Sequence, residues 1–377
     1  MRLSSLHLVT IVLIIVIFNA CKHKKQVELN SENNDTETNI KYAKGFEIQQ
    51  FKDYKKLLIK APYQNSKETF EFILTKKNTP NTKNTIQIPL KSIVVTSTTH
   101  IPMLELLRVE NKLIGYPNTS YISSKRTRTL IDKGIIKDLG NEERINTELL
   151  LELHPDAVIG FSINSNNKMF TNIQQLGIPV ILNGDWLEET PLGRAEWIKL
   201  FGVLFDQEAV ADSIFSTIET AYLNAKKTAL KSSLKPTILS GGLFKDIWNL
   251  PAGNSFEATF LKDANTHYLW SDSKGNGSLS LNIENVFEKG INAELWIAPS
   301  FYNSLKQLEK ANDINSKFKA FQNKEVYSFV NKRGETGGIL YFELAPARPD
   351  LVLKDIIKIA HPELMQHYEF TFYEKLE

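Results

Sequence analysis

The sequence predicts an α/β protein in which two Rossmann-like lobes, each with a parallel sheet, are joined by a single long α-helix and preceded by a small N-terminal β-hairpin extension. Short apolar runs alternate with helical stretches in residues 91–190 and again in residues 232–377, which is the rhythm of parallel strands with helical crossovers. Between these lobes, residues 191–231 are expected to form connecting helices. Before residue 91, apolar runs alternate with polar turns, as in antiparallel strands.

The composition is that of a protein with a large folded core. Hydrophobic residues make up 42% of the 377 residues and charged residues 23%, which excludes disorder along the whole chain. The net charge of +2 argues against nucleic-acid binding through a strongly basic surface. A single cysteine excludes an intrachain disulfide and a zinc site built from cysteines.

The N-terminus has the pattern of a lipoprotein signal peptide. Arg2 precedes an apolar run from Leu8 to Phe18, which is too short to span a bilayer that needs about 20 residues. The sole cysteine, Cys21, follows Asn19 and Ala20 as it would in a lipobox. We therefore expect residues 1–20 to be the signal peptide, Cys21 to be lipidated, and residues 21–40 to be a flexible tether. The alternative is a buried thiol behind a short membrane anchor.

The elements follow in order. Residues 41–90 form the β extension, with strands at 46–51 and 70–74. In the lobe at residues 91–190 we predict strands at 93–95, 113–115, 157–160 and 180–182, and helices at 102–109, 125–132 and 147–153. Helices then cover 191–204 and 207–231, the second with an apolar stripe through Phe215, Ile218 and Tyr222. The lobe at residues 232–377 has strands at 237–240, 295–298 and 326–329 and a final helix at 349–360.

Several segments together resemble the class III periplasmic substrate-binding proteins, which serve importers of iron–siderophore and cobalamin. They are, in order, residues 153–159 (LHPDAVI), 176–180 (LGIPV), 250–255 (LPAGNS) leading to Asp263-Ala264, 282–296, and 361–364 (HPEL). The resemblance covers residues 91–365. It implies a monomeric binding protein without catalytic residues, cofactor or nucleic-acid partner, anchored in the periplasm and paired with an ABC permease and ATPase.

The resemblance also implies a surface glutamate on each lobe for docking to the permease. Glu257 is the counterpart that we expect in the second lobe. The first lobe has Asn166, Asn167 and Lys168 where its glutamate is expected, so docking there uses other residues or the ligand is handed on differently.

In parallel sheets the ligand sits beyond the carboxyl ends of the strands, so two facing lobes share one cleft. Aromatic side chains at strand ends suit a large, partly apolar ligand, although each one taken alone also fits core packing. Thr98 and Thr99 either face the cleft or cap the following helix. Arg333 either meets an anionic ligand or lies solvated on the surface. The predicted ligand-binding residues are Thr98, Thr99, His100, Tyr116, Phe161, Ser162, Asp185, Trp186, Phe244, Trp248, Trp270, Tyr302 and Arg333.

The expected ligand is an iron–siderophore-type metal chelate, with cobalamin or haem as the alternative. Only His100 and His267 are left for the cleft, too few for a bare-metal site. A different class of function is an envelope enzyme or chelatase on the same scaffold, which requires His100, His267, Asp185 and Glu335 to converge. A scaffold lipoprotein is the remaining alternative, and it predicts neither a deep cleft nor a small ligand.

Overall fold

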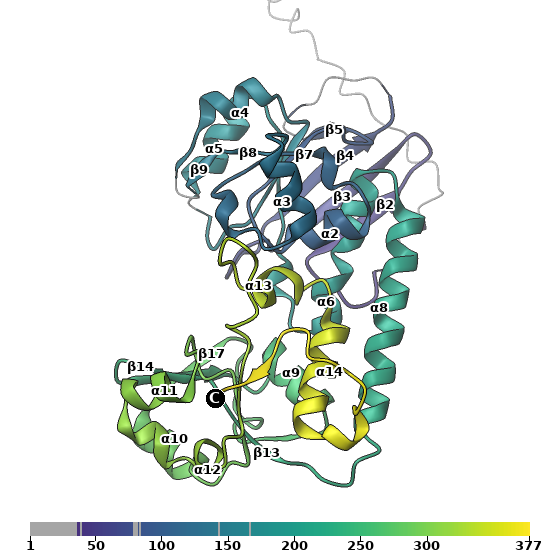
Figure 1. The fold of residues 1–377 in the computed structure, drawn as a ribbon. Helices are drawn as coiled ribbons and strands as arrows, with labels where there is room; N and C mark the ends of the chain where they lie inside the picture. Colours follow the sequence, from purple (N-terminus) through teal and green to yellow (C-terminus); the bar gives the residue numbers. More distant parts are fainter. Residues whose placement is uncertain (1–35, 38–39, 78–81, 83, 142–143, 166) are drawn as a thin grey trace, which may run out of the picture. The chain divides into compact units, whose positions relative to one another are not determined.

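The computed structural model describes residues 36–377 except 38–39, 78–81, 83, 142–143 and 166 (Figure 1). The predicted signal peptide, the lipidation site Cys21 and most of the tether lie outside the described residues. Within the described ranges, no helix combines the length and apolar character needed to cross a membrane. Thr36–Glu377 forms one compact unit.

The N-terminal extension is larger than the predicted hairpin. Its five strands are β1 (Thr36–Glu37), β2 (Phe46–Gln50), β3 (Tyr54–Lys60), β4 (Thr69–Thr75) and β5 (Thr85–Gln87), arranged in that order. Neighbouring strands are antiparallel except β4 and β5, which are parallel. Strands β1 and β5 contain too few residues to show an alternating pattern, which is why the sequence indicated only a hairpin.

Two buried glutamates hold the chain that enters this sheet. The Glu196 carboxylate accepts the backbone N–H groups of Lys41, Tyr42 and Ala43 at 2.6–3.1 Å. The Glu188 carboxylate accepts those of Lys44 and Gly45, together with the indole N–H of Trp197 at 3.0 Å. Buried carboxylates with several such donors are strong anchors, so the extension is fixed to the helices that follow the first lobe.

The first lobe is a parallel sheet in the order β12-β11-β6-β7-β8. Its strands are β6 (Ile93–Val95), β7 (Leu113–Tyr116), β8 (Lys137–Asp138), β11 (Ala157–Gly160) and β12 (Val180–Leu182). Its helices are α2 (His100–Leu106), α3 (Lys125–Asp132), α4 (Thr147–Leu153) and α5 (Lys168–Gln175), and a small pair, β9 (Gly140–Asn141) and β10 (Arg144–Ile145), lies beside them.

A single long helix, α8 (Glu208–Ala229), follows α6 (Pro191–Glu196) and α7 (Ile198–Leu204). At 1.5 Å per residue its 22 residues span about 33 Å. Phe215 and Ile218 belong to the core shared by the extension and the first lobe, whereas Tyr222 and Ala225 belong to the core of the second lobe. The predicted joining helix is therefore confirmed, because its apolar stripe is divided between two cores.

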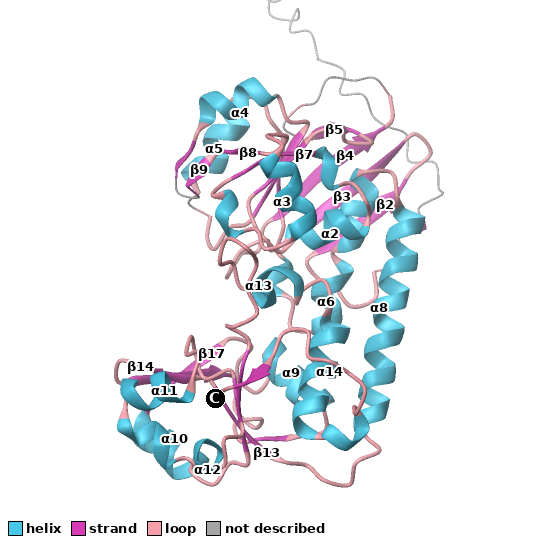
Figure 2. Ribbon diagram, in the orientation of Figure 1, coloured by secondary structure: helices cyan, strands magenta, loops and turns pink. Residues whose placement is uncertain are grey.

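The second lobe has a sheet in the order β16-β13-β18-β19-β20, parallel except for its last strand. Figure 2 shows the helices and strands of this lobe, with β13 labelled. These strands are β13 (Thr237–Ser240), β16 (His267–Tyr268), β18 (Leu295–Ile297), β19 (Val326–Ser328) and β20 (Glu374–Lys375). A second, antiparallel sheet contains β14 (Gly242–Phe244), β15 (Ile247–Pro251) and β17 (Ser278–Asn282). The helices are α9 (Phe256–Asp263), α10 (Ile283–Gly290), α11 (Leu305–Ala311), α12 (Lys319–Gln322), α13 (Leu340–Leu344) and α14 (Pro349–Ala360), and α14 packs on α8.

Candidate functional site

The carboxyl ends of the first lobe's strands open into a pocket of about 290 Å³ that is also lined by the second lobe. Residues after β6 and β11 and at the end of β7 form one wall. Residues just before and within α13 form the other. We call this the cleft pocket; its lining residues are Thr96, Ser97, Thr98, Tyr116, Tyr121, Phe161, Gly338, Ile339 and Phe342. None of them is ionisable at neutral pH, so the walls offer hydroxyl groups and aromatic rings.

Three of the first-lobe residues predicted to bind ligand line the cleft pocket: Thr98, Tyr116 and Phe161. The ring of Trp186 lies edge-on to Phe161 at a centroid distance of 5.5 Å, so it supports the wall. The Ser162 hydroxyl donates to its neighbour, the Asn164 carbonyl, at 2.7 Å. Ligand contact by these residues stays a prediction, since the positions alone do not test it.

Thr99, His100 and Asp185 form a layer next to the pocket. The Thr99 hydroxyl does not cap α2; it donates to Asp185 Oδ2 at 3.1 Å. Asp185 is buried, and burial raises its pKa to about 6 against the opposing charge of Arg194. His100 is fully buried beside Phe201, with no hydrogen-bond partner at either ring nitrogen, and burial lowers its pKa to about 3. The structure thus places the His100 imidazole in the core, outside the lining of the cleft pocket.

A smaller pocket of about 100 Å³ lies at the carboxyl ends of β13, β18 and β19 in the second lobe. We call it the inner pocket. Phe342 lines both pockets, so the two adjoin at that ring. The inner pocket is lined by Ser240, Glu257, Phe260, Leu261, Ile297, Ala298, Phe329, Tyr341, Phe342, Ile356 and Tyr373.

The aromatic residues of the second lobe that were predicted to bind ligand line neither pocket. Trp248 is fully buried, stacks on Trp296 at 5.3 Å and donates its indole N–H to the Ser240 carbonyl. Trp270 is buried in the same core, and Tyr302 is half-buried against it. Phe244 is 64% exposed at the turn between β14 and β15.

Arg333 begins a segment that crosses from the second lobe to the first. Its guanidinium donates to the Gly337 carbonyl at 2.8 Å, and its backbone forms a bridge with Ile339. The side chain is exposed. Arg333 therefore closes its own loop and does not line the cleft pocket. We call the segment Arg333–Leu344 the strap.

Specific contacts hold the strap on the first lobe. The Glu343 carboxylate accepts the backbone N–H groups of Ser123 and Ser124 at 2.6 and 3.0 Å, immediately before α3. The Thr336 hydroxyl donates to the Ser120 carbonyl at 2.7 Å. A Cβ on Gly334 would lie 2.5 Å from the Ser123 Cα, so only glycine permits this approach.

Sequence reasoning missed Tyr121, Ile339 and Phe342, the last two of them on the strap. Tyr121 lies in a 3₁₀ turn (Thr119–Tyr121), and α13 has only five residues. Neither segment shows apolar periodicity. The glycines at 334, 337 and 338 next to aromatic residues were the one available signal of a close backbone approach.

Glu257, the predicted docking residue, lines the inner pocket from the first turn of α9. Its side chain is exposed by surface area, yet burial raises its pKa, with Arg194 acting in the opposite direction. The exposure and the raised pKa are compatible for a carboxylate on the wall of a cavity, because solvent reaches it from one side while protein atoms lie on the others. Its role in docking stays a prediction.

The residues proposed for an enzymatic alternative do not converge. In the described part of the chain, no three His, Cys, Asp or Glu side chains come close enough to hold a metal ion. His267 is exposed at the start of β16, Glu335 is exposed on the strap, and His100 is enclosed in the core. The arrangement that a chelatase would need is therefore not formed by these residues with Asp185.

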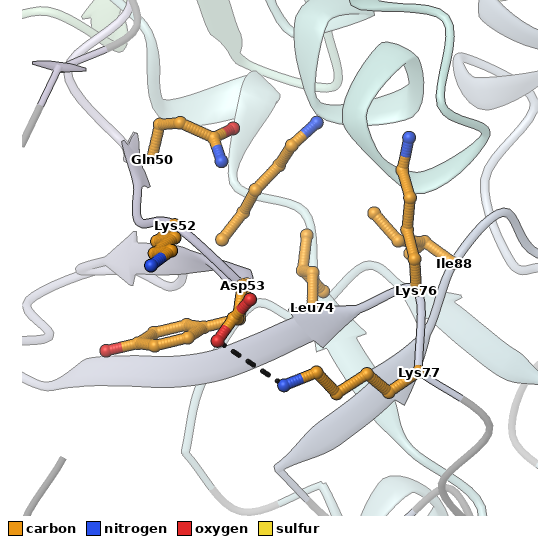
Figure 3. A pocket seen from close by; sticks show the side chains of 9 residues that line it. Gln50, Lys52, Asp53, Leu74, Lys76, Lys77 and Ile88 are labelled. Atoms are coloured by element: carbon orange, nitrogen blue, oxygen red, sulfur yellow. Dashed lines mark ion pairs between the residues drawn. The ribbon is translucent and has the colours of Figure 1, made fainter.

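Two larger depressions lie away from the strand ends. One, of about 520 Å³, lies on the extension, where three of the four lining lysines are paired with acids: Lys76 with Asp206 at 2.7 Å, Lys77 with Asp53 at 3.4 Å, and Lys55 with Glu208. Figure 3 marks the Lys77–Asp53 pair. The other, of about 540 Å³, lies between α6, α8 and α9. We favour the cleft pocket over both because both lobes and their strand ends build it, and volume alone does not indicate a site.

The comparisons with known proteins agree on one family. Residues 93–331 match the family model described as periplasmic binding protein. An uncharacterized lipoprotein of Methanocaldococcus jannaschii is 24% identical, covering 97% of this chain and 94% of the relative. A Staphylococcus epidermidis structure described as a possible iron-binding periplasmic solute-binding protein has a TM-score of 0.57 and 16% identity, covering 72% of this chain and 99% of its own. The periplasmic haem-binding protein of Vibrio cholerae has a TM-score of 0.54 and 18% identity, covering 70% and 99%.

Proposed function

Because this chain belongs to the periplasmic binding protein family, we propose that it is the substrate-binding subunit of an ABC importer and captures a metal chelate between its two lobes. The observation that carries this proposal is the cleft pocket. It lies at the carboxyl ends of β6, β7 and β11, where open parallel sheets bind ligands, and the strap closes its opposite wall.

Within this class, the finer proposal is an iron–siderophore-type chelate. Aromatic rings at Tyr116, Tyr121, Phe161 and Phe342 suit a bulky ligand with an apolar periphery. Cobalamin and haem remain the alternatives, and the haem-binding structural relative is one reason to include haem. Arg333 gives little reason to expect a strongly anionic chelate, since its guanidinium donates to the Gly337 carbonyl outside the pocket lining.

A fluorescence titration tests this proposal. Trp186 lies against Phe161 in the wall of the cleft pocket, so a bound chelate within a few ångström should quench its emission. The chain from residue 22 is titrated with ferric siderophores, cobalamin and haem, and Trp186→Phe serves as the matched variant. We expect saturable quenching by one ligand class at micromolar concentration or below, most of it lost in Trp186→Phe. A folded protein that binds no member of the panel would contradict the proposal.

Anchoring and docking complete the proposed transport role. We propose that lipidated Cys21 holds the protein at the periplasmic face of an envelope membrane, in line with the name of the Methanocaldococcus relative. Glu257 remains the proposed contact to the permease in the second lobe. Fractionation of a Cys21→Ser variant tests the anchor: the protein should leave the membrane fraction, and retention there would refute lipidation at this residue.

A further inference from the structure

The inner pocket has one acidic side chain in its wall, that of Glu257. Among the described residues no ion-pair partner lies within 4.0 Å of it, and its hydrogen bond comes from its own backbone N–H. Burial raises the pKa values of Tyr268, Tyr341 and Tyr373, and the Glu257 carboxylate raises them further. The carboxylate therefore lies on the pocket wall, open to solvent on one side, and has no ion-pair partner among the described residues.

Aromatic rings form much of the remaining wall. Phe329 is stacked on Tyr341 with centroids 4.3 Å apart, while Phe342 and Tyr373 meet Phe329 nearly at right angles, at 79° and 84°. In the stacked pair, Phe329 and Tyr341 each cover one face of the other, so an incoming group can meet only their opposite faces or the ring of Phe342. The faces of aromatic rings attract cations through their quadrupoles, and the attraction is strongest where water is excluded.

The nearest positive charge does not fill this role. Arg194 donates its guanidinium N–H groups to the carbonyls of Trp186 and Glu188 at 3.0 and 3.4 Å. The guanidinium lies 3.6 Å from the centre of the Phe256 ring, and Arg194 does not line the inner pocket. Asp185, whose charge also interacts with Arg194, adds a second carboxylate on that side. The surroundings therefore leave Glu257 available to an incoming cation.

We propose that the inner pocket is a subsite for an organic cation, bound between the Glu257 carboxylate and the rings of Phe329, Tyr341 and Phe342. Its volume of about 100 Å³ is two-thirds of the roughly 150 Å³ of a cavity that holds benzene, so it has room for an ammonium head group such as trimethylammonium, while the rest of the ligand stays outside. Phe342 lines both pockets, and a ligand that occupies both would pass along that ring. That this cation is part of the transported chelate rests on the proposed function.

The test compares choline with its uncharged isostere 3,3-dimethylbutan-1-ol, which has the same shape without the charge. Both are titrated by calorimetry into the full chain purified in a maltoside detergent. We expect choline to bind at least about tenfold more tightly than the alcohol. In Glu257→Gln, which keeps the size of the side chain, choline should lose about tenfold while the alcohol is unchanged. Glu288→Gln, an exposed glutamate on α10, is the control and should change neither.

The wild type alone can refute the inference: either equal affinities for choline and the alcohol, or no binding of choline, would do so. Choline affinity that survives Glu257→Gln would overturn it too, and leave Glu257 as a docking residue. The experiments distinguish failure of the cation subsite from failure of the proposed chelate-binding function. A chelate that binds while choline does not refutes the cation subsite alone; choline binding without any chelate binding refutes the chelate function alone.

Discussion

Replacing His100 by leucine should change how stability depends on pH. The imidazole is fully buried, has no hydrogen-bond partner, and has a pKa lowered by burial from 6.5 to about 3. Between these values the unfolded chain binds a proton that the folded chain does not, so the wild type loses stability as the pH falls below 6.5. At pH 5 this loss is about 2 kcal/mol, since each pH unit below 6.5 costs about 1.36 kcal/mol. Leucine cannot titrate, so the variant escapes the loss.

Urea unfolding of both proteins at pH 8 and pH 5 measures the effect. The free energy of unfolding of His100→Leu minus that of the wild type should increase by about 2 kcal/mol from pH 8 to pH 5. Any change in packing is present at both pH values and cancels in this comparison. His367→Leu, at an exposed position, serves as the control for the loss of a histidine. A difference that is the same at both pH values would refute burial of His100 and return it to the cleft.

Three further predictions concern the strap, the extension and the pocket wall. Burial raises the pKa of Glu343 from 4.5 to about 7, so proton binding by this carboxyl stabilises the folded state below pH 4.5, and the stabilisation is lost as the pH rises to 7. In Glu343→Gln, the free energy of unfolding measured with urea should fall less between pH 4.5 and pH 7 than in the wild type, by up to about 3 kcal/mol. An unchanged pH dependence would refute the burial of Glu343. Glu196→Ala leaves the backbone N–H groups of Lys41, Tyr42 and Ala43 without their acceptor and should expose the chain before Phe46 to limited proteolysis. A wild-type cleavage pattern would show that other contacts suffice. Phe161→Ala should weaken chelate binding about tenfold in the fluorescence titration, and an unchanged Kd would place the ligand elsewhere.

Much of the fold could be predicted because the apolar periodicity of an element and the capping of a helix depend on residues that are close together in the sequence. The sequence placed helices at 125–132, 147–153 and 349–360, the bounds of α3, α4 and α14, and a strand at 157–160, the bounds of β11. Ser124 and Asn146 each cap the helix that follows, as their side chains favour. The family resemblance is confirmed by the match over residues 93–331.

The candidate site could be predicted only where it lies at strand ends. Thr98, Tyr116 and Phe161 were found in this way. In β15, alternate residues are buried, and Trp248 is one of them. Which of the two alternating sets faces the core depends on how β15 pairs with β14 and β17, and the sequence of β15 alone does not determine it. The strap was missed because Glu343 and Thr336 reach the first lobe across more than 200 residues of sequence.

The central claim is that the ligand binds between the lobes, and hydrogen–deuterium exchange with and without a saturating chelate tests its location most directly. We predict slower exchange in residues 96–98, 161–162 and 338–342, the segments that meet at the cleft pocket. Protection confined to residues 50–55 and 74–77 on the extension, or to residues 189–192 and 253–263 between α6 and α9, would contradict the claim and place the ligand in one of the larger depressions.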